Sequence, residues 1–170
     1  MQKYVFRKYE NEYPRLFKKE KRTLQKVCGP KATIEHVGST AVKGLGGKGI
    51  IDIAVGVPKN NLEEYSNKLQ NAHYELRQEA STDERLFFRK DDANRRIHLH
   101  LTVFGSRDWT EMTAFRDYLT LHPEEAGKYS DLKKKAALVA KGNGKAYRKY
   151  KEKFITRLTR KAIGEKKPKT

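Results

Sequence analysis

The stretch Glu35-His36-Val37-Gly38-Ser39-Thr40, closely followed by Ile50-Ile51-Asp52-Ile53-Ala54-Val55-Gly56-Val57, decides the fold class. The first predicts a short strand over residues 32–37 that runs into a turn of small residues. The second is almost wholly apolar and ends at Pro58, which indicates a strand covered on both faces. Asp52 is its one charged residue. Because a buried carboxylate is costly unless it is bonded or holds a metal, Asp52 is a candidate functional residue.

The rest of the chain predicts a mixed α/β (α+β) protein. Further strands are expected over residues 73–78, 85–90 and 95–104, with a hairpin turn at 91–94. Apolar residues at helical spacing predict helices over residues 9–27, 60–72 with Asn60 as its cap, 108–121, 123–141 and 145–163, the last ended by Gly164. We therefore expect a mixed β-sheet flanked by helices, with a helical C-terminal part.

One domain is expected over residues 1–164, followed by a basic disordered tail over 165–170. The chain has 170 residues, 36% of them hydrophobic, which is enough for one core. No long apolar run and no apolar N-terminal stretch occur, so we expect a protein of the cytoplasm without a membrane segment. Its one cysteine, Cys28, excludes an internal disulfide and is expected to be buried.

The formal net charge of +17 favours polyanionic partners: phosphorylated small molecules, nucleotides or RNA. Much of the excess lies in the last third of the chain, as in Lys133-Lys134-Lys135 and Tyr147-Arg148-Lys149-Tyr150-Lys151. Such runs are also typical of a solvated helix face, and the sequence leaves both interpretations open.

The turn Gly38-Ser39-Thr40 is a candidate phosphate site. Small residues after a strand let backbone N–H groups and a hydroxyl approach phosphate oxygens, and a helix N-terminus there adds partial positive charge. Asp52 on the next strand is then placed to hold Mg²⁺ against those phosphates. Many turns have this composition without binding anything. Lys48, in the glycine-rich loop, is a further phosphate contact or else a solvated lysine.

His98 and His100 share one face of the strand over residues 95–104, because alternate residues point the same way. Two imidazoles at this spacing can ligate a metal or donate protons to phosphate, and they can equally be ordinary polar residues of a sheet. Together with Asp52 they form a candidate catalytic and metal cluster. Glu35 and His36 point to opposite faces, so at most one of them completes it, and we name Glu35 as the metal ligand.

The motifs taken together resemble the GrpB family over nearly the whole chain. They are Glu35 to Thr40, Gly44-Leu45, Lys48, Ile51-Asp52-Ile53, His98-Leu99-His100, Phe115-Arg116-Asp117-Tyr118-Leu119, Pro123, Ala126, Tyr129, Leu132-Lys133, and Tyr147 through Lys151 to Phe154. The chain departs from the family at Lys43-Gly44 and Lys48-Gly49, where Pro-Gly and Lys-Pro are usual.

The resemblance implies a nucleotidyltransferase fold like that of DNA polymerase β. In active enzymes of that superfamily, the Gly-Ser turn holds the triphosphate and carboxylates on two strands bind two metal ions. The second carboxylate would fall at Ala54, which binds no metal, and the third on the strand that carries His98 and His100. The resemblance therefore implies a divergent site, with Mg²⁺ or Mn²⁺ favoured over Zn²⁺.

Three functions compete at this stage. The leading one is a nucleotide- or phosphate-binding protein that transfers a nucleotidyl group if it is an enzyme. Its further positive residues are Arg89, Arg96, Arg116, Lys133 and Lys151, each of which is otherwise a surface ion pair. The second is a nucleic-acid-binding or assembly module that uses the basic helices. The third is a metal-dependent phosphoester hydrolase built on Asp52, His98 and His100.

Overall fold

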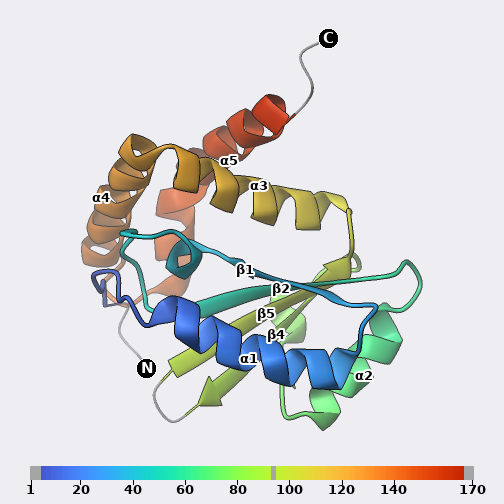
Figure 1. Ribbon diagram of the computed structural model, residues 1–170. Helices are drawn as coiled ribbons and strands as arrows, with labels where there is room; N and C mark the ends of the chain where they lie inside the picture. The colour runs from blue at the N-terminus through green and yellow to red at the C-terminus, as the bar shows by residue number, and fades with distance from the viewer. Residues whose placement is uncertain (1–4, 93–94, 167–170) are drawn as a thin grey trace.

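A five-stranded mixed sheet forms the centre of the computed structural model, which describes residues 5–92 and 95–166 (Figure 1). The strand order is β1-β2-β5-β4-β3. The strands are β1 (Thr33–Val37), β2 (Ile51–Val57), β3 (Glu75–Leu76), β4 (Arg85–Asp92) and β5 (Arg95–Val103). The helices are α1 (Tyr13–Cys28), α2 (Leu62–Asn71), α3 (Arg107–Leu121), α4 (Pro123–Ala140) and α5 (Gly144–Lys166), with 3₁₀ turns η1 (Ser39–Ala41) and η2 (Gln78–Ala80).

The central pair of strands, β2 and β5, runs parallel, and the other pairs are antiparallel. Asp52 lies directly opposite His98 in this pair, and Ala54 lies opposite His100. On the outer side of β5, β4 places Phe87 opposite His100. The register alone therefore sets the carboxylate of β2 beside the two histidines of β5.

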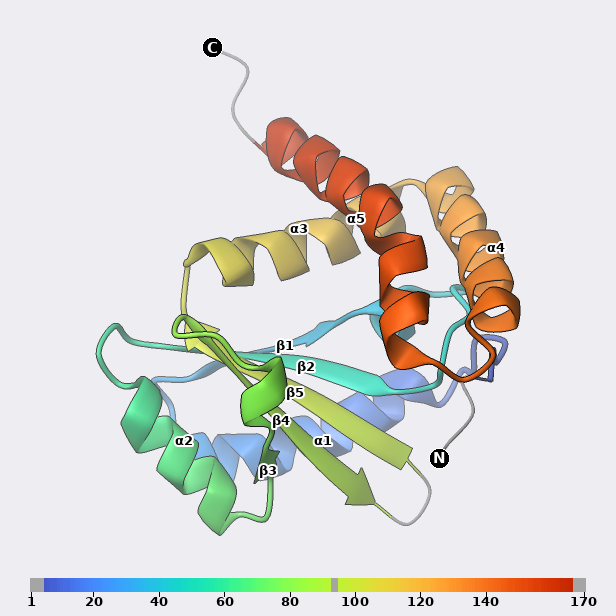
Figure 2. The ribbon, with the colours of Figure 1, turned by 180° about the vertical axis from the view of Figure 1, so that it is seen from behind.

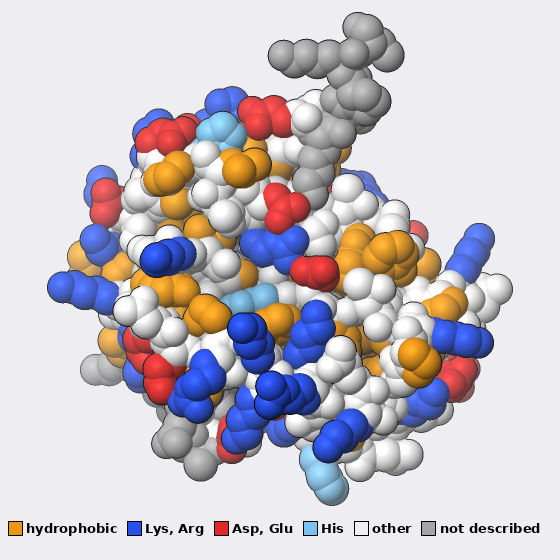
Figure 3. Space-filling model, viewed as in Figure 1, with side chains coloured by type: hydrophobic (Ala, Val, Ile, Leu, Met, Phe, Trp, Pro, Cys, Tyr) orange, Lys and Arg blue, Asp and Glu red, His pale blue; other side chains and the backbone are white. Residues whose placement is uncertain are grey.

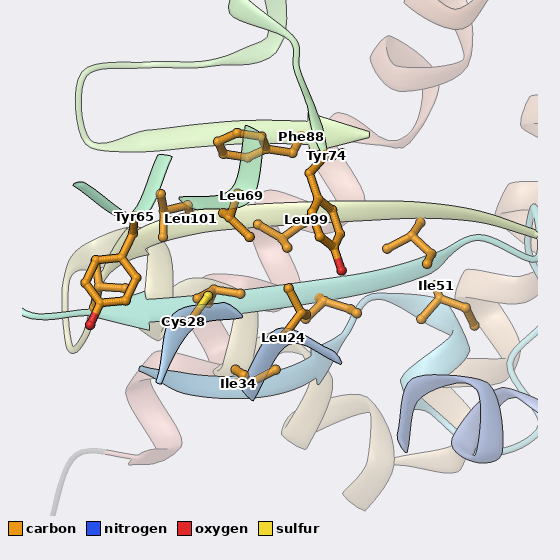
Figure 4. Close-up of a cluster of buried hydrophobic side chains, with 14 of the residues drawn as sticks. Leu24, Cys28, Ile34, Ile51, Tyr65, Leu69, Tyr74, Phe88, Leu99 and Leu101 are labelled. Atoms are coloured by element: carbon orange, nitrogen blue, oxygen red, sulfur yellow. The ribbon is translucent and has the colours of Figure 1, made fainter. Parts of the chain in front are cut away.

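One face of the sheet is apolar and is covered by α1 and α2. Alternate residues of β2 and β5, such as Ile53 and Leu99, are fully buried there against Leu24 of α1 and Leu69 of α2 (Figure 4). Cys28 belongs to this core, and burial raises the pKa of its thiol to about 11. The expected buried thiol is thereby confirmed.

The opposite face is covered only in part. The helix α3 packs over β1 and β2, where Trp109 contacts Val37 and Ala54. Ser106 caps this helix by accepting a hydrogen bond from the Trp109 amide. The helices α4 and α5 pack on α3 and, as Figure 2 shows, lie on the opposite side of the sheet from α1 and α2. The face of β5 and β4 that carries the histidines is thus bordered by α5.

The expected mixed sheet with flanking helices is confirmed, but several element ends differ. The helix α1 begins at Tyr13, where Pro14 occupies the first turn, rather than at Tyr9. Asn60 does not cap α2, because it lies before the helix in a left-handed conformation with φ 71°. His73, with φ 65°, still belongs to the turn after α2, so β3 shrinks to Glu75–Leu76.

The ends of α5 and β4 also differ from the expectation. Gly164 does not end α5, which continues to Lys166, since a glycine inside a helix weakens it without breaking it. Asp91 and Asp92 belong to β4 rather than to a turn. Residues 93–94 of the expected turn and 167–170 of the expected tail lie outside the described residues. No helix in the described part of the chain has the length and apolar character that crossing a bilayer requires.

Candidate phosphate-binding site

The sheet face opposite α1 carries the predicted cluster of Asp52, His98 and His100. The Asp52 carboxylate lies 3.4 Å from Nδ1 of His98 and 3.8 Å from Nε2 of His100. Burial alone would raise the pKa of the Asp52 carboxyl, but the approach of His100 and His98 outweighs it and holds that pKa well below its usual range. Asp52 is therefore a carboxylate at every physiological pH.

A cavity of about 500 Å³ opens above this cluster, between β2 and β5 on one side and the three C-terminal helices on the other. It is lined by most of the residues that the sequence singled out. They are Gly38, Ser39, Lys48, Asp52, His98, His100, Lys133 and Lys151. Segments from the whole length of the chain thus meet at one place.

Two glycines make the close approach of the Gly38-Ser39 turn possible. Gly38 has φ 70°, and a Cβ atom there would lie 2.6 Å from Oδ2 of Asp52. A Cβ atom on Gly47 would lie 2.7 Å from Oγ of Ser39 and 3.1 Å from Nζ of Lys133. The helix η1 that follows the turn is only three residues long, so the partial positive charge expected from a helix N-terminus is absent here.

Three lysines converge on the same cavity. Burial, helped by repulsion from Lys151, lowers the pKa of Lys133 to about 7. Burial and the nearby Lys48 lower the pKa of Lys151 to about 8, and burial lowers that of Lys48 as well. The Lys133 side chain is 2% exposed and donates a hydrogen bond to the Gly46 carbonyl. These amines are held together against their mutual repulsion.

The rings of two tyrosines contact the ammonium groups of the three lysines. Nζ of Lys151 lies 4.3 Å and Nζ of Lys48 5.3 Å from the ring centre of Tyr147. Nζ of Lys133 lies 4.6 Å from the ring centre of Tyr129, whose own pKa is raised by burial. Cation–π contact of this kind stabilises an ammonium group in a poorly hydrated site. Both tyrosines belong to the family motifs in the sequence, but neither was expected to have a role in the site.

The predicted metal ligand Glu35 does not reach the cluster. Its carboxylate is bound by Arg116 at 2.8 Å, and Arg116 also donates to the His36 carbonyl. Arg116 is thereby used in the fold and does not line the cavity, contrary to its expected role. Within residues 5–92 and 95–166, no group of three or more His, Cys, Asp or Glu side chains is placed to hold a metal ion.

Thr40 and His36 also serve the fold. The Thr40 hydroxyl donates to the Ile50 carbonyl at 3.0 Å and lies 3.0 Å from Nε2 of His36. His36 stacks on Phe17 of α1, on the other side of the sheet from Glu35, as the alternation predicted. Burial and the nearby Arg116 lower the pKa of His36 to about 4, so it is neutral. Thr40 therefore locks the strand-turn geometry rather than facing the cavity.

Arg89 and Arg96 lie outside the cavity, in an adjacent groove. Both are bound to Asp91, Arg96 at 2.8 Å. Two arginines that were not among the expected site residues, Arg85 and Arg148, line both the cavity and the groove. For Arg148 the basic run 147–151 was a signal. Arg85 had none beyond its place at the start of a strand.

Comparison with known proteins identifies the family. The model of the family described as GrpB protein matches residues 4–161. The chain belongs to the GrpB family. A glutamate-rich protein GrpB of Alkalihalophilus pseudofirmus is similar at 31% identity over 88% of this chain and 90% of its own length. UPF0157 protein BH1888 of Halalkalibacterium halodurans is 36% identical over 76% of this chain and 67% of that one.

Solved structures agree with this assignment. The crystal structure of conserved protein GrpB from Enterococcus faecalis matches with a TM-score of 0.84 and 27% identity, over 95% of this chain and 98% of that one. A weaker likeness, with a TM-score of 0.49 and 10% identity, joins 76% of this chain to 43% of the Cid1 poly(U) polymerase. The GrpB fold is thus shown by the first comparison, and the second says nothing of activity.

Proposed function

We propose that this GrpB-family protein binds a nucleotide or another phosphorylated ligand in the cavity above Asp52. The observation that supports this most strongly is the convergence of Lys48, Lys133 and Lys151 on one carboxylate. Packing like charges in a buried site costs stability, so such an arrangement is typical of a functional site that a ligand completes. A phosphate supplies the missing negative charge and gives the amines hydrogen-bond acceptors.

The charges that line the cavity favour an anion. Two carboxylates, Asp52 and Glu111, face five cationic side chains. These are Lys48, Arg85, Lys133, Arg148 and Lys151. In a partly dehydrated cavity the attraction between such cations and a phosphate is stronger than in water. The turn Gly38-Ser39 lies on the same wall and offers a hydroxyl and backbone donors.

The non-phosphate part of the ligand has an apolar wall available. Met112 and Phe115 from α3 and Ile155 from α5 line the cavity beside Tyr129 and Tyr147. Ligand sites of this size are usually apolar with a few placed polar groups. A purely polar ion would leave this wall unused, which favours a phosphate ester with an organic group such as a nucleoside.

A divalent ion would bind this site only together with the phosphorylated ligand. Asp52 offers one carboxylate and is flanked by His98 and His100, while Glu35 is bound to Arg116. Mg²⁺ is commonly held by one or two carboxylates together with substrate phosphates. Asp52 is therefore the residue that would hold Mg²⁺ or Mn²⁺, which would neutralise phosphate charge beside the carboxylate. Glu35 is not part of this site.

The proposal ends at binding. Ala54, at the place of the second carboxylate of the superfamily pattern, is fully buried against Trp109. Two-metal transfer needs oxygen ligands that clamp both ions, and β2 supplies only Asp52. No observation adds support for nucleotidyl transfer or for phosphoester hydrolysis.

The test is a thermal-shift screen of nucleoside triphosphates and simpler phosphate esters, with and without Mg²⁺ or Mn²⁺. The variant is Lys133→Met, and the control is Lys135→Met on the exposed side of the same helix, which removes the same charge. We expect a ligand-dependent rise in Tm for wild type and Lys135→Met that Lys133→Met lacks. Equal shifts in all three proteins would sink the proposal.

A second candidate function rests on a different surface. Lys and Arg side chains gather over α1 on the face shown in Figure 3. The exposed ones are Arg15, Lys18, Lys19, Arg22 and Lys26. This surface favours a polyanion such as RNA. Binding there would fall steeply with salt and would be weakened by Lys19→Gln with Arg22→Gln, but not by Lys133→Met.

A further inference from the structure

A second cavity, of about 730 Å³, adjoins the first on the open face of β4 and β5. The two cavities share a wall, to which Lys48, Arg85, His98, His100 and Arg148 contribute. We name the second cavity the arginine groove. Its floor continues the histidine face of the sheet through Phe87, whose ring packs against both His98 and His100.

The arginine groove is more unbalanced in charge than the first cavity. Among the described residues, eight lysine and arginine side chains line it, against a single carboxylate, that of Glu79. Four of these arginines are paired with carboxylates of the rim: Arg77 with Glu75 and Glu79, Arg89 and Arg96 with Asp91, and Arg95 with Glu10. Among the described residues, Arg7, Arg85 and Arg148 have no carboxylate partner within ion-pair distance. Their charge is available to a ligand.

The hydrogen bonding of the Arg85 side chain is a second feature of the shared wall. Its Nε is buried and has no hydrogen-bond partner in the described part of the molecule, and Nδ1 of His100 is in the same condition. A buried guanidinium N–H without an acceptor costs free energy, so it is normally satisfied by protein, water or ligand. Arg85 stands on the shared wall, so the charge of its guanidinium group faces both cavities.

We propose that the arginine groove binds the phosphate of a second ligand, so that the protein holds two phosphorylated molecules on either side of His98 and His100. This inference rests on the proposed function, because the first molecule is the ligand of the lysine cavity. Each cavity falls in the usual size range for one small-molecule ligand. Their shared cations offset the repulsion between two phosphates, which in a site lacking them would prevent joint binding.

The experiment is a calorimetric titration of the full chain with inorganic pyrophosphate, alone and after saturation with the nucleotide that gives the largest thermal shift. Three variants separate the cavities: Lys133→Met in the first, Arg7→Gln in the groove, and Arg85→Met on the shared wall. Arg22→Gln, exposed on α1 beyond the sheet, is the charge-matched control. Arg7 is also exposed, so its replacement does not threaten the fold.

We expect pyrophosphate to bind the nucleotide-saturated protein, and Arg7→Gln and Arg85→Met to weaken this binding about tenfold, the effect of one charge-assisted hydrogen bond. Arg22→Gln should leave it unchanged, and Lys133→Met, titrated without nucleotide, should still bind pyrophosphate in the groove. Pyrophosphate binding that is lost in Lys133→Met and untouched by Arg7→Gln would overturn the groove proposal and leave the first site standing. No pyrophosphate binding to the nucleotide-saturated protein would overturn the groove proposal alone, because the nucleotide still reports on the first cavity. Equal weakening by Arg22→Gln would show unspecific attraction and would also overturn the groove.

Discussion

The two faces of the central sheet are made from alternate residues of the same strands, yet they have opposite properties. On the face toward α1 and α2, Ile53 and Leu99 are fully buried in an apolar core. On the other face, their immediate neighbours Asp52 and His98 open into a cavity. The side chains of the first face are packed against one another and against the helices that cover them. The second holds like charges together, and among the described residues the buried Nε of Arg85 there has no hydrogen-bond partner.

The two faces should therefore respond differently to substitution of their side chains. Removal of apolar volume from the first face should cost stability and leave ligand binding intact. Removal of charge from the second should cost ligand binding and leave stability intact or raise it. Stability and function are thus carried by odd and even positions of the same strand, and paired substitutions one residue apart can separate them.

The largest effect is expected from Leu99→Ala on the apolar face. The substitution leaves a cavity beneath β5 and should lower the free energy of unfolding by about 2–5 kcal/mol. For a domain of this size, each kcal/mol lowers Tm by about 2–4 °C. The check is a denaturant unfolding curve. The rise in Tm on addition of the ligand should persist, and its disappearance would break the separation of the two faces.

Gly38→Ala should affect both properties. The new Cβ would lie 2.6 Å from Oδ2 of Asp52, in a backbone conformation with φ 70° that alanine adopts at a cost. We expect a loss of about 1–3 kcal/mol in stability and a weaker ligand-induced thermal shift. Gly44→Ala, with φ 82° and open space around its Cβ, is the matched control for the backbone cost alone. Equal ligand shifts in the two variants would contradict the close approach of Gly38 to the site.

Lys133→Met should change stability in the direction opposite to Leu99→Ala. The pKa of Lys133 is about 7 in the fold and returns to its ordinary, higher value on unfolding, so the unfolded chain binds more protons in between. Wild-type stability should therefore rise with pH from about 7 to about 10, and the variant should lack this part of the rise. We expect the ligand-free variant to be more stable at pH 7 by about 1–2 kcal/mol. Urea unfolding across this pH range measures both, and a destabilised variant would show that Lys133 is structural.

Anion affinity should fall as pH rises. Lys133, with pKa about 7, and Lys151, with pKa about 8, lose their charge through this window in the free protein. Sulfate is a suitable probe because its own charge is constant there. We expect an affinity at least about tenfold weaker at pH 9 than at pH 6.5, since each lost charge removes about one charge-assisted contact. A flat profile in wild type, or an equal fall in Lys133→Met, would place sulfate elsewhere.

Much of the fold and part of the site could be predicted from the sequence, because both depend on local alternation. The pattern of residues 95–104 placed His98 and His100 on one face, and the lone charge of the apolar stretch marked Asp52. Long-range partners could not be derived. Nothing local shows that Arg116 binds Glu35, that Thr40 turns to the Ile50 carbonyl, or that Arg85 lacks an acceptor. These depend on how segments far apart in the chain meet: α3 with β1, the turn η1 with the start of β2, and β4 with the C-terminal helices.

The most direct test of the phosphate cavity is a crystal structure grown with Mn²⁺ and the nucleoside triphosphate that gives the largest thermal shift. Our account predicts phosphate density between the Gly38-Ser39 turn and Lys133, with an anomalous manganese peak beside Asp52 and the phosphates. Phosphate density over α1 instead, or an empty cavity under saturating ligand, would contradict it.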